Sequence, residues 1–408
     1  MAQLQRREGV LPNQHLQQLI EAGVVAAPEG SPIPSENVQP ASIDLRLGPV
    51  AHPLRCSFLP GQEAVLQRMN SSVKDGGEVD LRGGGGELEA GRPYLIPLKE
   101  SLRLPRNMRG KANPKSSTGR ADVFTRVITD RSYRFDEIAA GYHGSLYLEV
   151  VPLSFKIRVC EDLTLNQLRV SVGRAQLRDH ELIEAHELTP LLYKDGHVVA
   201  ADDLAVSDGL FLGVNLKGTK KYTRIGYRAQ ERPPLLDMTR VGEAPIDHYW
   251  ERIPTRLPDR VILEPKRFYL LMSNEAVCIP PNLAAEMTAY DPTSGELRTH
   301  YAGFFDPGFG YDREKRFQGS TAALEVRAHD VGFMIEHGQR LCKLTFERMV
   351  DEPSLLYGEG IGSNYQRQTE TLGKHFKVSP AKVHSDASPQ NDTAADQLPL
   401  FAPERERT

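Results

Sequence analysis

Residues 94–108 read "YLIPLKESLRLPRNM", and residues 269–283 read "YLLMSNEAVCIPPNL". Aligned at an offset of 175 positions, the two stretches share Tyr94/Tyr269, Glu100/Glu275, Pro105/Pro280 and Asn107/Asn282. The chain has 408 residues, which is more than a single core usually spans, so two domains are expected. The repeated stretch predicts that the second domain is a duplicate of the first.

Two further matches follow in the same order along both copies. "GSLYLEV" at 144–150 corresponds to "GSTAALEV" at 319–326, which places Glu149 opposite Glu325. "LNQL" in the first copy then corresponds to "LCKL" in the second copy at an offset of 176 positions. Several matches at nearly one offset are hard to obtain by chance, so they indicate that the whole domain is duplicated.

Short alternating segments dominate the chain. Glycine (34 residues) and proline (29 residues) separate them, a pattern typical of all-β domains built from short strands. Residues 11–23, "LPNQHLQQLIEAG", are an exception, because Leu16, Leu19 and Ile20 fall on one side of a helix that Gly23 ends. We therefore expect an all-β fold with a few short helices.

The composition changes toward the end of the chain. The sequence from Ser379 onward is polar and rich in Pro, Ala and Asp, which predicts disorder. The segment between the two copies shows only mixed strands and loops. The expected parts are a first domain at 1–172, a connecting segment at 173–235, a second domain at 236–376 and a tail at 377–408.

Charge and hydropathy narrow the class of protein. The net charge of −4 argues against a surface that coats nucleic acid. No apolar run approaches the roughly 20 residues that cross a bilayer, and the N-terminal "MAQLQRREGVLPNQ" lacks the apolar stretch of a secretory signal. We therefore expect a cytoplasmic protein that binds neither nucleic acid nor membrane. The cysteines form no Cys-x-x-Cys pair and are expected to be reduced thiols in the core: Cys56, Cys160, Cys278 and Cys342.

The stretch "KSSTGR" at 115–120 places short hydroxyl side chains between two cations. Ser116 and Ser117 offer hydroxyl and backbone N–H groups, and a glycine lets the chain turn. Lys115 and Arg120 supply positive charge, the arginine with a planar group that suits phosphate oxygens. The spacing of a Walker A loop is absent. A polar turn with solvated charges is the alternative, since Ser, Thr and Gly are common in loops.

A strand carboxylate follows at matched positions in both copies. The first copy contains, in this order, Asp136, a Gly-aromatic-x-Gly turn and Glu149. The second copy contains, in the same order, Asp306, a Gly-Phe-Gly turn and Glu325. Each glutamate lies between two apolar residues, so on an alternating strand it points to the opposite face. A carboxylate on a covered face is costly without a partner or a function, whereas one on an exposed face is ordinary. Recurrence in both copies favours a function.

The ordered set of motifs resembles the dCTP deaminases, which belong to the trimeric dUTPase-like superfamily. The motifs are "VQPASIDLRLG" (38–48), "KSSTGR" (115–120), the run from Asp136 to Glu149, and "YGEGIGSNYQRQ" (357–368). The resemblance covers most of residues 8–172 and 260–376 and is strongest to the duplicated bacterial form. It implies duplicated dUTPase-like β-barrel (β-clip) domains. It also implies hydrolytic deamination of dCTP to dUTP and ammonia, a step in pyrimidine deoxynucleotide synthesis.

The resemblance assigns roles to individual residues. Phosphate binding is implied for Lys115, Ser116, Ser117 and Arg120, and closure over the phosphates for Tyr357 and Gln368. Binding of the base and the deoxyribose is implied for Asp136 and Asp306. General acid/base catalysis is implied for Glu149 and Glu325. It also implies a homo-oligomer with dCTP and dUTP as ligands.

The second copy lacks the cations of the KSSTGR bend. Its "AYDPTSGE" at 289–296 aligns Asp291 and Glu296 with the two cations at an offset of 176, or Asp291 and Pro292 with the serine pair at an offset of 175. In either register the cations are gone and a carboxylate is present, so a triphosphate is repelled there. In the superfamily that the chain resembles, sites form between neighbouring domains. The favoured arrangement therefore combines the KSSTGR bend with Asp306 and Glu325 of the second copy. A site that uses Glu149 is the alternative, because both glutamates are retained.

Deamination at C4 of cytosine needs one proton taken from water and one given to the leaving amine. A single buried glutamate performs both transfers in turn if desolvation raises its pKa. Zinc-dependent nucleobase deaminases carry a His-x-Glu and Cys-x-x-Cys signature, and this chain has neither motif. We therefore expect no zinc, and Mg²⁺ held through the phosphate oxygens of the nucleotide.

Two other functions stay open at this point. A dUTP diphosphatase, or an enzyme that performs both reactions, has the same fold. The strand glutamates in both copies favour deamination over the diphosphatase. A nucleotide-binding regulatory protein without catalysis is the third possibility, because the second phosphate loop has lost its cations.

Overall fold

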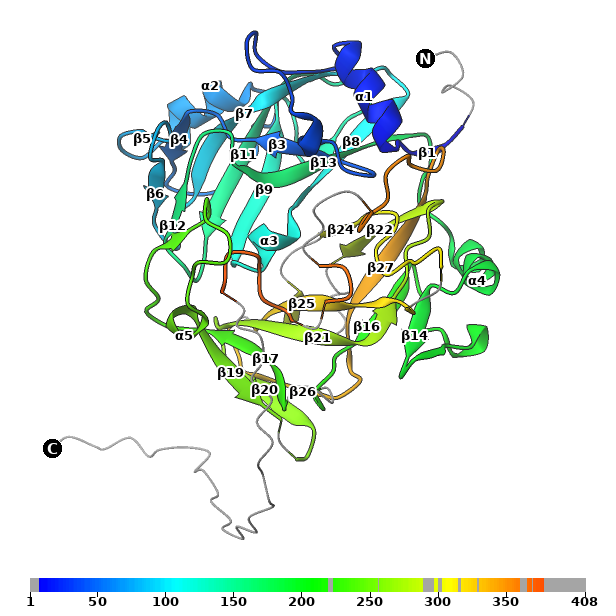
Figure 1. Ribbon diagram of the computed structural model, residues 1–408. Helices are drawn as coiled ribbons and strands as arrows, with labels where there is room; N and C mark the ends of the chain where they lie inside the picture. Colours follow the sequence, from blue (N-terminus) through cyan, green and yellow to red (C-terminus); the bar gives the residue numbers. More distant parts are fainter. Residues whose placement is uncertain are drawn as a thin grey trace, which may run out of the picture. The chain divides into compact units, whose positions relative to one another are not determined.

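The chain is built mainly of antiparallel β-sheets, as the sequence predicts (Figure 1). The computed structural model describes residues 7–377 except 219–222, 256, 289–296, 300–302, 315–316, 329, 360–364 and 369, and only the backbone of 297–299. The described residues belong to a unit that ends at Lys377. The predicted disordered tail and the loop at 289–296 lie outside this part of the chain.

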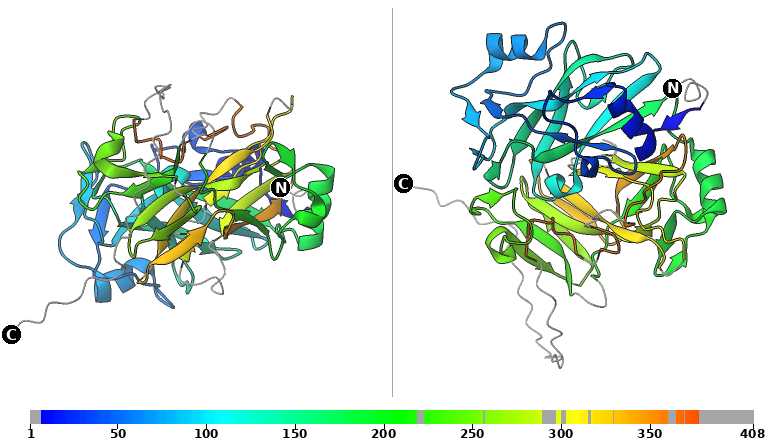
Figure 2. Two further views of the ribbon diagram at one scale, coloured as in Figure 1. Left: turned by 90° about the horizontal axis from the view of Figure 1, so that it is seen from below. Right: turned by 45° about the horizontal axis from the view of Figure 1, so that its top comes forward.

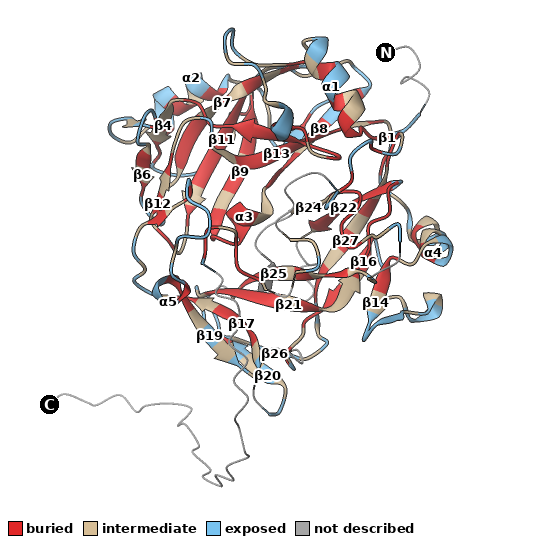
Figure 3. Cartoon of the chain, in the orientation of Figure 1, coloured by how far each residue is buried: buried red, intermediate tan, exposed pale blue. Residues whose placement is uncertain are grey.

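The first copy holds two main sheets that enclose a core. The first sheet runs β5 (Val79–Asp80), β4 (Val50–Pro53), β7 (Tyr94–Arg103), β11 (His143–Pro152) and β9 (Val123–Thr129), with β2 (Val25–Ala26) beside β7. The second sheet runs β1 (Gly9–Val10), β13 (Thr164–Val172), β8 (Met108–Pro114) and β10 (Glu137–Ile138), with β3 (Ile43–Arg46) beside β13. Figure 3 shows most of β11 and β13 buried, so these strands lie in the core.

The second copy repeats this arrangement. Its first sheet runs β15 (His197–Val198), β14 (Leu192–Lys194), β21 (Phe268–Val277), β17 (Arg224–Ala229) and β19 (Trp250–Pro254), with β25 (Ser320–Ala328) between β21 and β23 (Leu297–Thr299). Its second sheet runs β16 (Leu210–Gly213), β27 (Arg340–Arg348), β22 (Leu283–Thr288) and β24 (Gly303–Phe305). Smaller sheets join β20 (Arg260–Leu263) to β26 (Phe333–Glu336), and β18 (Leu236–Asp237) to β12 (Ile157–Val159) and β6 (Gly86–Leu88).

The predicted duplication is confirmed by strand pairing and by individual contacts. β7 pairs with β11 as β21 pairs with β25, and β8 pairs with β13 as β22 pairs with β27. The Tyr94 hydroxyl accepts the Glu89 N–H at 3.0 Å, and the Tyr269 hydroxyl accepts the Glu264 N–H at 2.9 Å. The repeated sequence stretch therefore has the same local structure in both copies.

Equivalent positions of the two copies meet in an ion pair. Lys111 on β8 and Glu286 on β22 are related by the offset of the repeat, since 286 − 111 = 175. The Lys111 ammonium donates to one oxygen of the buried Glu286 carboxylate, and the Asn113 side-chain amide donates to the other at 2.8 Å. Two identical copies place like charges at such a contact, so divergence of the copies is what permits the pair.

Exchange of these charges tests the contact between the copies. We expect Lys111→Glu to lower the free energy of unfolding by about 1–3 kcal/mol, because it sets a second carboxylate against a buried one. The double variant K111E/E286K restores opposite charges and recovers most of the loss. Urea unfolding followed by circular dichroism measures both. If the double variant is no more stable than the single one, the pair does not contribute as argued.

The helix predicted near the N-terminus is present, whereas a helix in the middle of the chain was not predicted. The predicted first helix is present as α1 (Asn13–Glu21), with Leu16 and Leu19 buried and Gly23 at φ +68° after its end. Helix α4 (Asp179–Leu188) was not predicted and lies at the outer edge of the second copy (Figures 1 and 2). The remaining helical turns are α2 (Val65–Arg68), α3 (Ser116–Gly119), α5 (Ile246–Tyr249), η2 (Ser35–Asn37), η3 (Met69–Val73) and η4 (Ala201–Asp203).

The stretch expected to connect the copies contributes strands to the second copy. Within 173–235, β14 and β17 pair with β21, and β16 pairs with β27. These strands are short and separated by loops, so they carry too little alternation to be assigned to a sheet from sequence. The residues of β14 and β17 that pair with β21 lie more than forty positions along the chain from their partners. Pairing over this distance is decided by tertiary packing.

The expectation of four core thiols is wrong for two of them. Cys278 and Cys342 are buried, but Cys160 is half-buried and Cys56 is exposed; all four are free. Cys56 follows β4 and begins a loop, so the apolar residues near it in sequence do not cover it. Within the described part of the chain, no helix has the length and apolar character needed to span a membrane.

Candidate active site

The KSSTGR bend begins where strand β8 ends. Pro114 is the last residue of β8, and Ser116–Gly119 form the helical turn α3. The Lys115 N–H donates to the Leu165 carbonyl of β13 at 3.0 Å, which ties the bend to the neighbouring strand. In Figure 1 the turn α3 faces the second copy, and it contacts β24 there. The bend is therefore fixed by the first copy and directed at the second.

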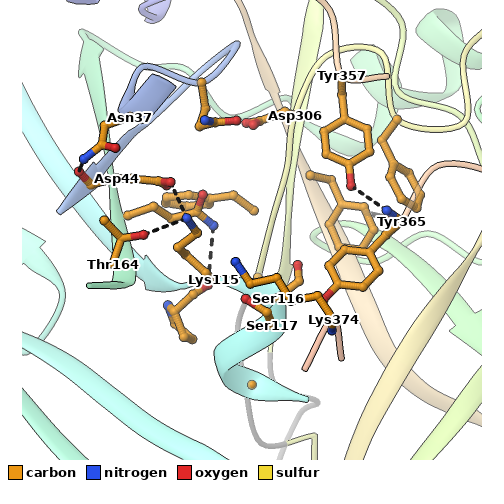
Figure 4. A pocket seen from close by; sticks show the side chains of 18 of the residues that line it. Asn37, Asp44, Lys115, Ser116, Ser117, Thr164, Asp306, Tyr357, Tyr365 and Lys374 are labelled. Atoms are coloured by element: carbon orange, nitrogen blue, oxygen red, sulfur yellow. Dashed lines mark hydrogen bonds and ion pairs between the residues drawn. The ribbon is translucent and has the colours of Figure 1, made fainter. Parts of the chain in front are cut away.

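A pocket of about 690 Å³ lies between the bend and the second copy (Figure 4). A volume of this size suits a ligand as large as a nucleotide. Residues 365–368 and 370–377, named the closing segment below, form a further wall. The predicted site residues that line the pocket are Lys115, Ser116, Ser117, Arg120, Asp306, Glu325, Tyr357 and Gln368. Residues that line it without having been predicted include Asp44, Thr164, Phe305, Phe309 and Lys374.

Lys115 is held by the first copy before any ligand arrives. Its ammonium donates to the Asp44 carboxylate of β3 and to the Thr164 hydroxyl at 2.9 Å (Figure 4). Burial raises the pKa of Asp44, and the Lys115 charge opposes that rise. The second carboxylate oxygen of Asp44 is buried and has no hydrogen-bond partner among the described residues. Asp44 lies within the motif at 38–48 but was not predicted as a site residue; the available signal was a carboxylate between the apolar Ile43 and Leu45.

Arg120 joins the bend to the closing segment. Its guanidinium carbon lies 3.8 Å from the centre of the Tyr365 ring, an arrangement that favours a cation. The same guanidinium donates to the Thr371 carbonyl at 3.3 Å. Arg120 is only 4% exposed, so these contacts hold a desolvated charge at the pocket wall.

Glu325 presents its carboxylate to the bend from strand β25. A Cβ added at Gly119 would come within 2.5 Å of the Glu325 carboxylate, so the glycine leaves the space that this side chain fills. Burial raises the pKa of Glu325 to about 8; the Arg120 charge opposes this rise and the Asp122 charge adds to it. No hydrogen bond joins the carboxylate to another residue in the described ranges. A carboxyl group with this pKa takes up and releases a proton near neutral pH.

Asp306 follows β24 and is oriented by a residue of the first copy. Arg169 on β13 donates to the Asp306 carboxylate at 3.4 Å and to Glu347 at 2.7 Å. The Arg169 guanidinium also stacks on the Phe304 ring, with its carbon 3.9 Å from the ring centre. Burial raises the pKa of Asp306 to about 6, and the Arg169 charge opposes that rise. Arg169 was not predicted as a site residue, because only the packing of the two copies places it beside Asp306.

The equivalent carboxylates of the first copy do not line this pocket. Glu149 is fully buried and accepts two hydrogen bonds from the Arg126 guanidinium, at 2.6 and 3.2 Å. Arg126 stacks on Phe135, with its guanidinium carbon 3.6 Å from the ring centre. Asp136 accepts the Val127 N–H at 2.7 Å, and burial raises its pKa to about 7. Glu149 therefore has a cationic partner of its own.

Tyr357 and Gln368 connect the closing segment to the second copy. The Tyr357 hydroxyl accepts the Tyr365 N–H at 3.2 Å (Figure 4). The Gln368 side-chain amide donates to the Thr321 carbonyl of β25, while its side-chain oxygen is buried with no hydrogen-bond partner in the described part of the chain. Both residues therefore hold the closing segment against the pocket.

Histidine, cysteine and acidic side chains do not gather into a metal site in the described ranges. No group of three or more of them is placed to hold an ion there. The expected absence of zinc stays a prediction.

Comparison with known proteins places the chain in a family. Residues 7–174 match the N-terminal domain model of 2′-deoxycytidine 5′-triphosphate deaminase, and residues 179–376 match its C-terminal domain model. The crystal structure of 2′-deoxycytidine 5′-triphosphate deaminase from Agrobacterium tumefaciens is similar at 42% identity and a TM-score of 0.80, over 88% of this chain and 100% of that chain. A dUMP-forming dCTP deaminase from Methanobrevibacter smithii is 26% identical over 153 residues, which are 36% of this chain and 72% of the relative. The chain thus belongs to the dCTP deaminase family.

Proposed function

We propose that this protein hydrolyses dCTP to dUTP and ammonia in the pocket between the KSSTGR bend and Glu325. One observation carries the proposal: a bend of hydroxyls and cations and a buried carboxylate packed beside it line the same cavity. The bend suits a triphosphate, and the carboxylate suits proton transfer at the base. Membership of the family makes the protein a hydrolase of C–N bonds; the product and the roles of residues are part of the proposal.

Glu325 acts twice in the proposed reaction. As a carboxylate it accepts a proton from water while the water oxygen bonds to C4, and it passes that proton to ring nitrogen N3. It then takes the remaining hydroxyl proton and gives it to the amino group, so the C4–N bond breaks and ammonia leaves. A pKa of about 8 keeps both protonation states accessible near neutral pH.

The other pocket residues bind and orient the nucleotide in this proposal. Ser116, Ser117 and Arg120 contact the phosphates, and Tyr357 closes over them. Asp306 accepts hydrogen bonds from the deoxyribose and the base. Arg169 keeps the Asp306 carboxylate in place through the contact described above. All of these groups except Arg169 line the same pocket.

Metal enters the proposal only with the substrate. Mg²⁺ would neutralise the phosphate chain and bind mainly through phosphate oxygens and water. Deamination would proceed without zinc, because one buried carboxylate supplies both proton transfers. Assembly into a homo-oligomer and a cytoplasmic location stay predictions.

A second candidate is an enzyme that continues from dUTP to dUMP. The matching relative from Methanobrevibacter smithii is a dUMP-forming dCTP deaminase, and this observation favours the two-step reaction. A diphosphatase positions water at the α-phosphate, whereas deamination needs a proton-transfer group beside the base. Both reactions use the same phosphate contacts, so the products must be assayed separately.

Incubation with dCTP and Mg²⁺ is expected to release ammonia and dUTP in equal amounts. Ammonia, dUTP, dUMP and pyrophosphate are measured separately over time. Addition of a zinc-specific chelator in the presence of Mg²⁺ should leave the rate unchanged, whereas EDTA should lower it because it removes the ion that accompanies the phosphates. Formation of dUMP with pyrophosphate establishes the second candidate. Loss of ammonia release with the zinc chelator contradicts deamination without zinc.

A further inference from the structure

The closing segment is tied to the second copy by backbone hydrogen bonds. The Gly242 N–H donates to the Lys374 carbonyl at 2.9 Å, and the Ala244 N–H donates to the His375 carbonyl at 3.0 Å. The Lys377 N–H donates back to the Ala244 carbonyl at 2.8 Å. These bonds hold the backbone at Lys374 and in the three residues after it, so the position of Lys374 is fixed without a ligand.

A buried aromatic cluster anchors the end of the closing segment. Phe376 is 2% exposed, and its ring centre lies 5.5 Å from those of both Trp250 and Tyr249. Contacts of this kind stabilise one arrangement of the chain. The anchor therefore sets the path of the residues just before it.

That path leads Lys374 to the bend. A Cβ added at the preceding Gly373 would lie 3.4 Å from the Arg120 Cβ and 3.5 Å from the Ser117 carbonyl oxygen, so the segment passes directly over the bend. The Lys374 N–H donates to the Tyr365 hydroxyl at 3.2 Å, and Lys374 lines the pocket (Figure 4). Lys374 thus reaches the same end of the pocket as the serine hydroxyls.

Lys374 adds a cation where another cation already lies. It is half-buried, and none of the ion pairs between described residues includes it. The Asp44 carboxylate nearby is already paired with Lys115. Burial lowers the pKa of Lys374, and the Lys115 charge lowers it further. Two neighbouring cations that are partly removed from water repel each other, and a bound polyanion relieves that repulsion.

We propose that Lys374 binds the phosphate chain of the nucleotide and gives the site its preference for triphosphates over monophosphates. The inference rests on the proposed function, since it takes the pocket to be the nucleotide site. A triphosphate gains more from an added cation than a monophosphate does, because its charge is larger and extends further along the bend. Lys374 is therefore a residue that determines specificity.

Calorimetric titration with inorganic tripolyphosphate in Mg²⁺ buffer tests the inference. We expect Lys374→Met to weaken binding of tripolyphosphate about ten- to a hundredfold, which is the effect of removing one charged hydrogen-bond donor. Lys374→Arg should bind nearly as well as the unchanged protein. The matched control is Lys377→Met, since Lys377 is exposed in the same segment and does not line the pocket. It should bind tripolyphosphate normally.

Kinetics with two nucleotides provide the readout of specificity. Lys374→Met should raise the KM for dCTP far more than that for dCMP and leave kcat nearly unchanged. Tripolyphosphate binding that is normal in Lys374→Met, or weakened equally in Lys377→Met, overturns the inference. If Lys374→Met is thermally less stable, restored binding in Lys374→Arg supports the inference and its absence overturns it. If the unchanged protein releases no ammonia but Lys374→Met alone loses tripolyphosphate binding, the proposed deamination is refuted. The inference that Lys374 binds phosphate is then still supported.

Discussion

Glu325→Gln is expected to lower the rate of ammonia release from dCTP by about 10²–10⁴-fold, the usual effect of removing a general acid/base. Glutamine has nearly the same size and fills the space beside Gly119, but it neither takes a proton from water nor gives one to the amine. Because no phosphate contact is removed, binding of dCTP should persist. Steady-state ammonia assays and calorimetric titration with dCTP measure the two quantities.

The chain supplies its own control for this experiment. Glu149→Gln makes the same change at the equivalent position of the first copy, where Arg126 holds the carboxylate outside the pocket. We expect this variant to retain ammonia release and to lose about 1–3 kcal/mol of stability, because the half-buried Arg126 guanidinium loses its charged partner. Inactive Glu149→Gln together with active Glu325→Gln would move catalysis to the first copy.

Glu325→Gln is also expected to stabilise the folded protein at alkaline pH. Burial raises the pKa of Glu325 to about 8, above its ordinary value of 4.5. The folded state therefore binds more protons than the unfolded state between these values, and stability falls as the pH rises through this window. Above pH 8 the unchanged protein carries a desolvated charge that the variant lacks. The gain for the variant there is on the order of a few kcal/mol.

Thermal unfolding of both proteins at pH 5 and at pH 8.5 measures this effect. The variant should have the higher Tm at pH 8.5, and the difference should shrink toward pH 5, where Glu325 is protonated in the folded state. Asp136 and Asp306 also have raised pKa values, but they alter the pH dependence of stability equally in the unchanged protein and in the variant. A difference in Tm that does not vary with pH would show that the Glu325 carboxyl is not held in the way the structure indicates.

Local patterns were enough to predict the fold class and the composition of the bend. The repeated stretches at 94–108 and 269–283 predicted duplicated β domains, because strand alternation and repeat offsets are properties of neighbouring residues. The bend at 115–120 was recognisable for the same reason. Helix α4 and the exposure of Cys56 were missed, since packing against distant segments decides both.

By itself, the sequence determined that two carboxylates recur on equivalent strands, and it left the choice between them open. Tertiary structure decided which one shares a pocket with the bend. Glu325 and Arg120 lie 325 − 120 = 205 residues apart, and only the packing of one copy on the other brings their charges together. The same packing adds Lys374, whereas Glu149 forms its ion pair with Arg126 within the first copy. Electrostatic and steric contacts depend on distance in space, and position along the chain does not set that distance.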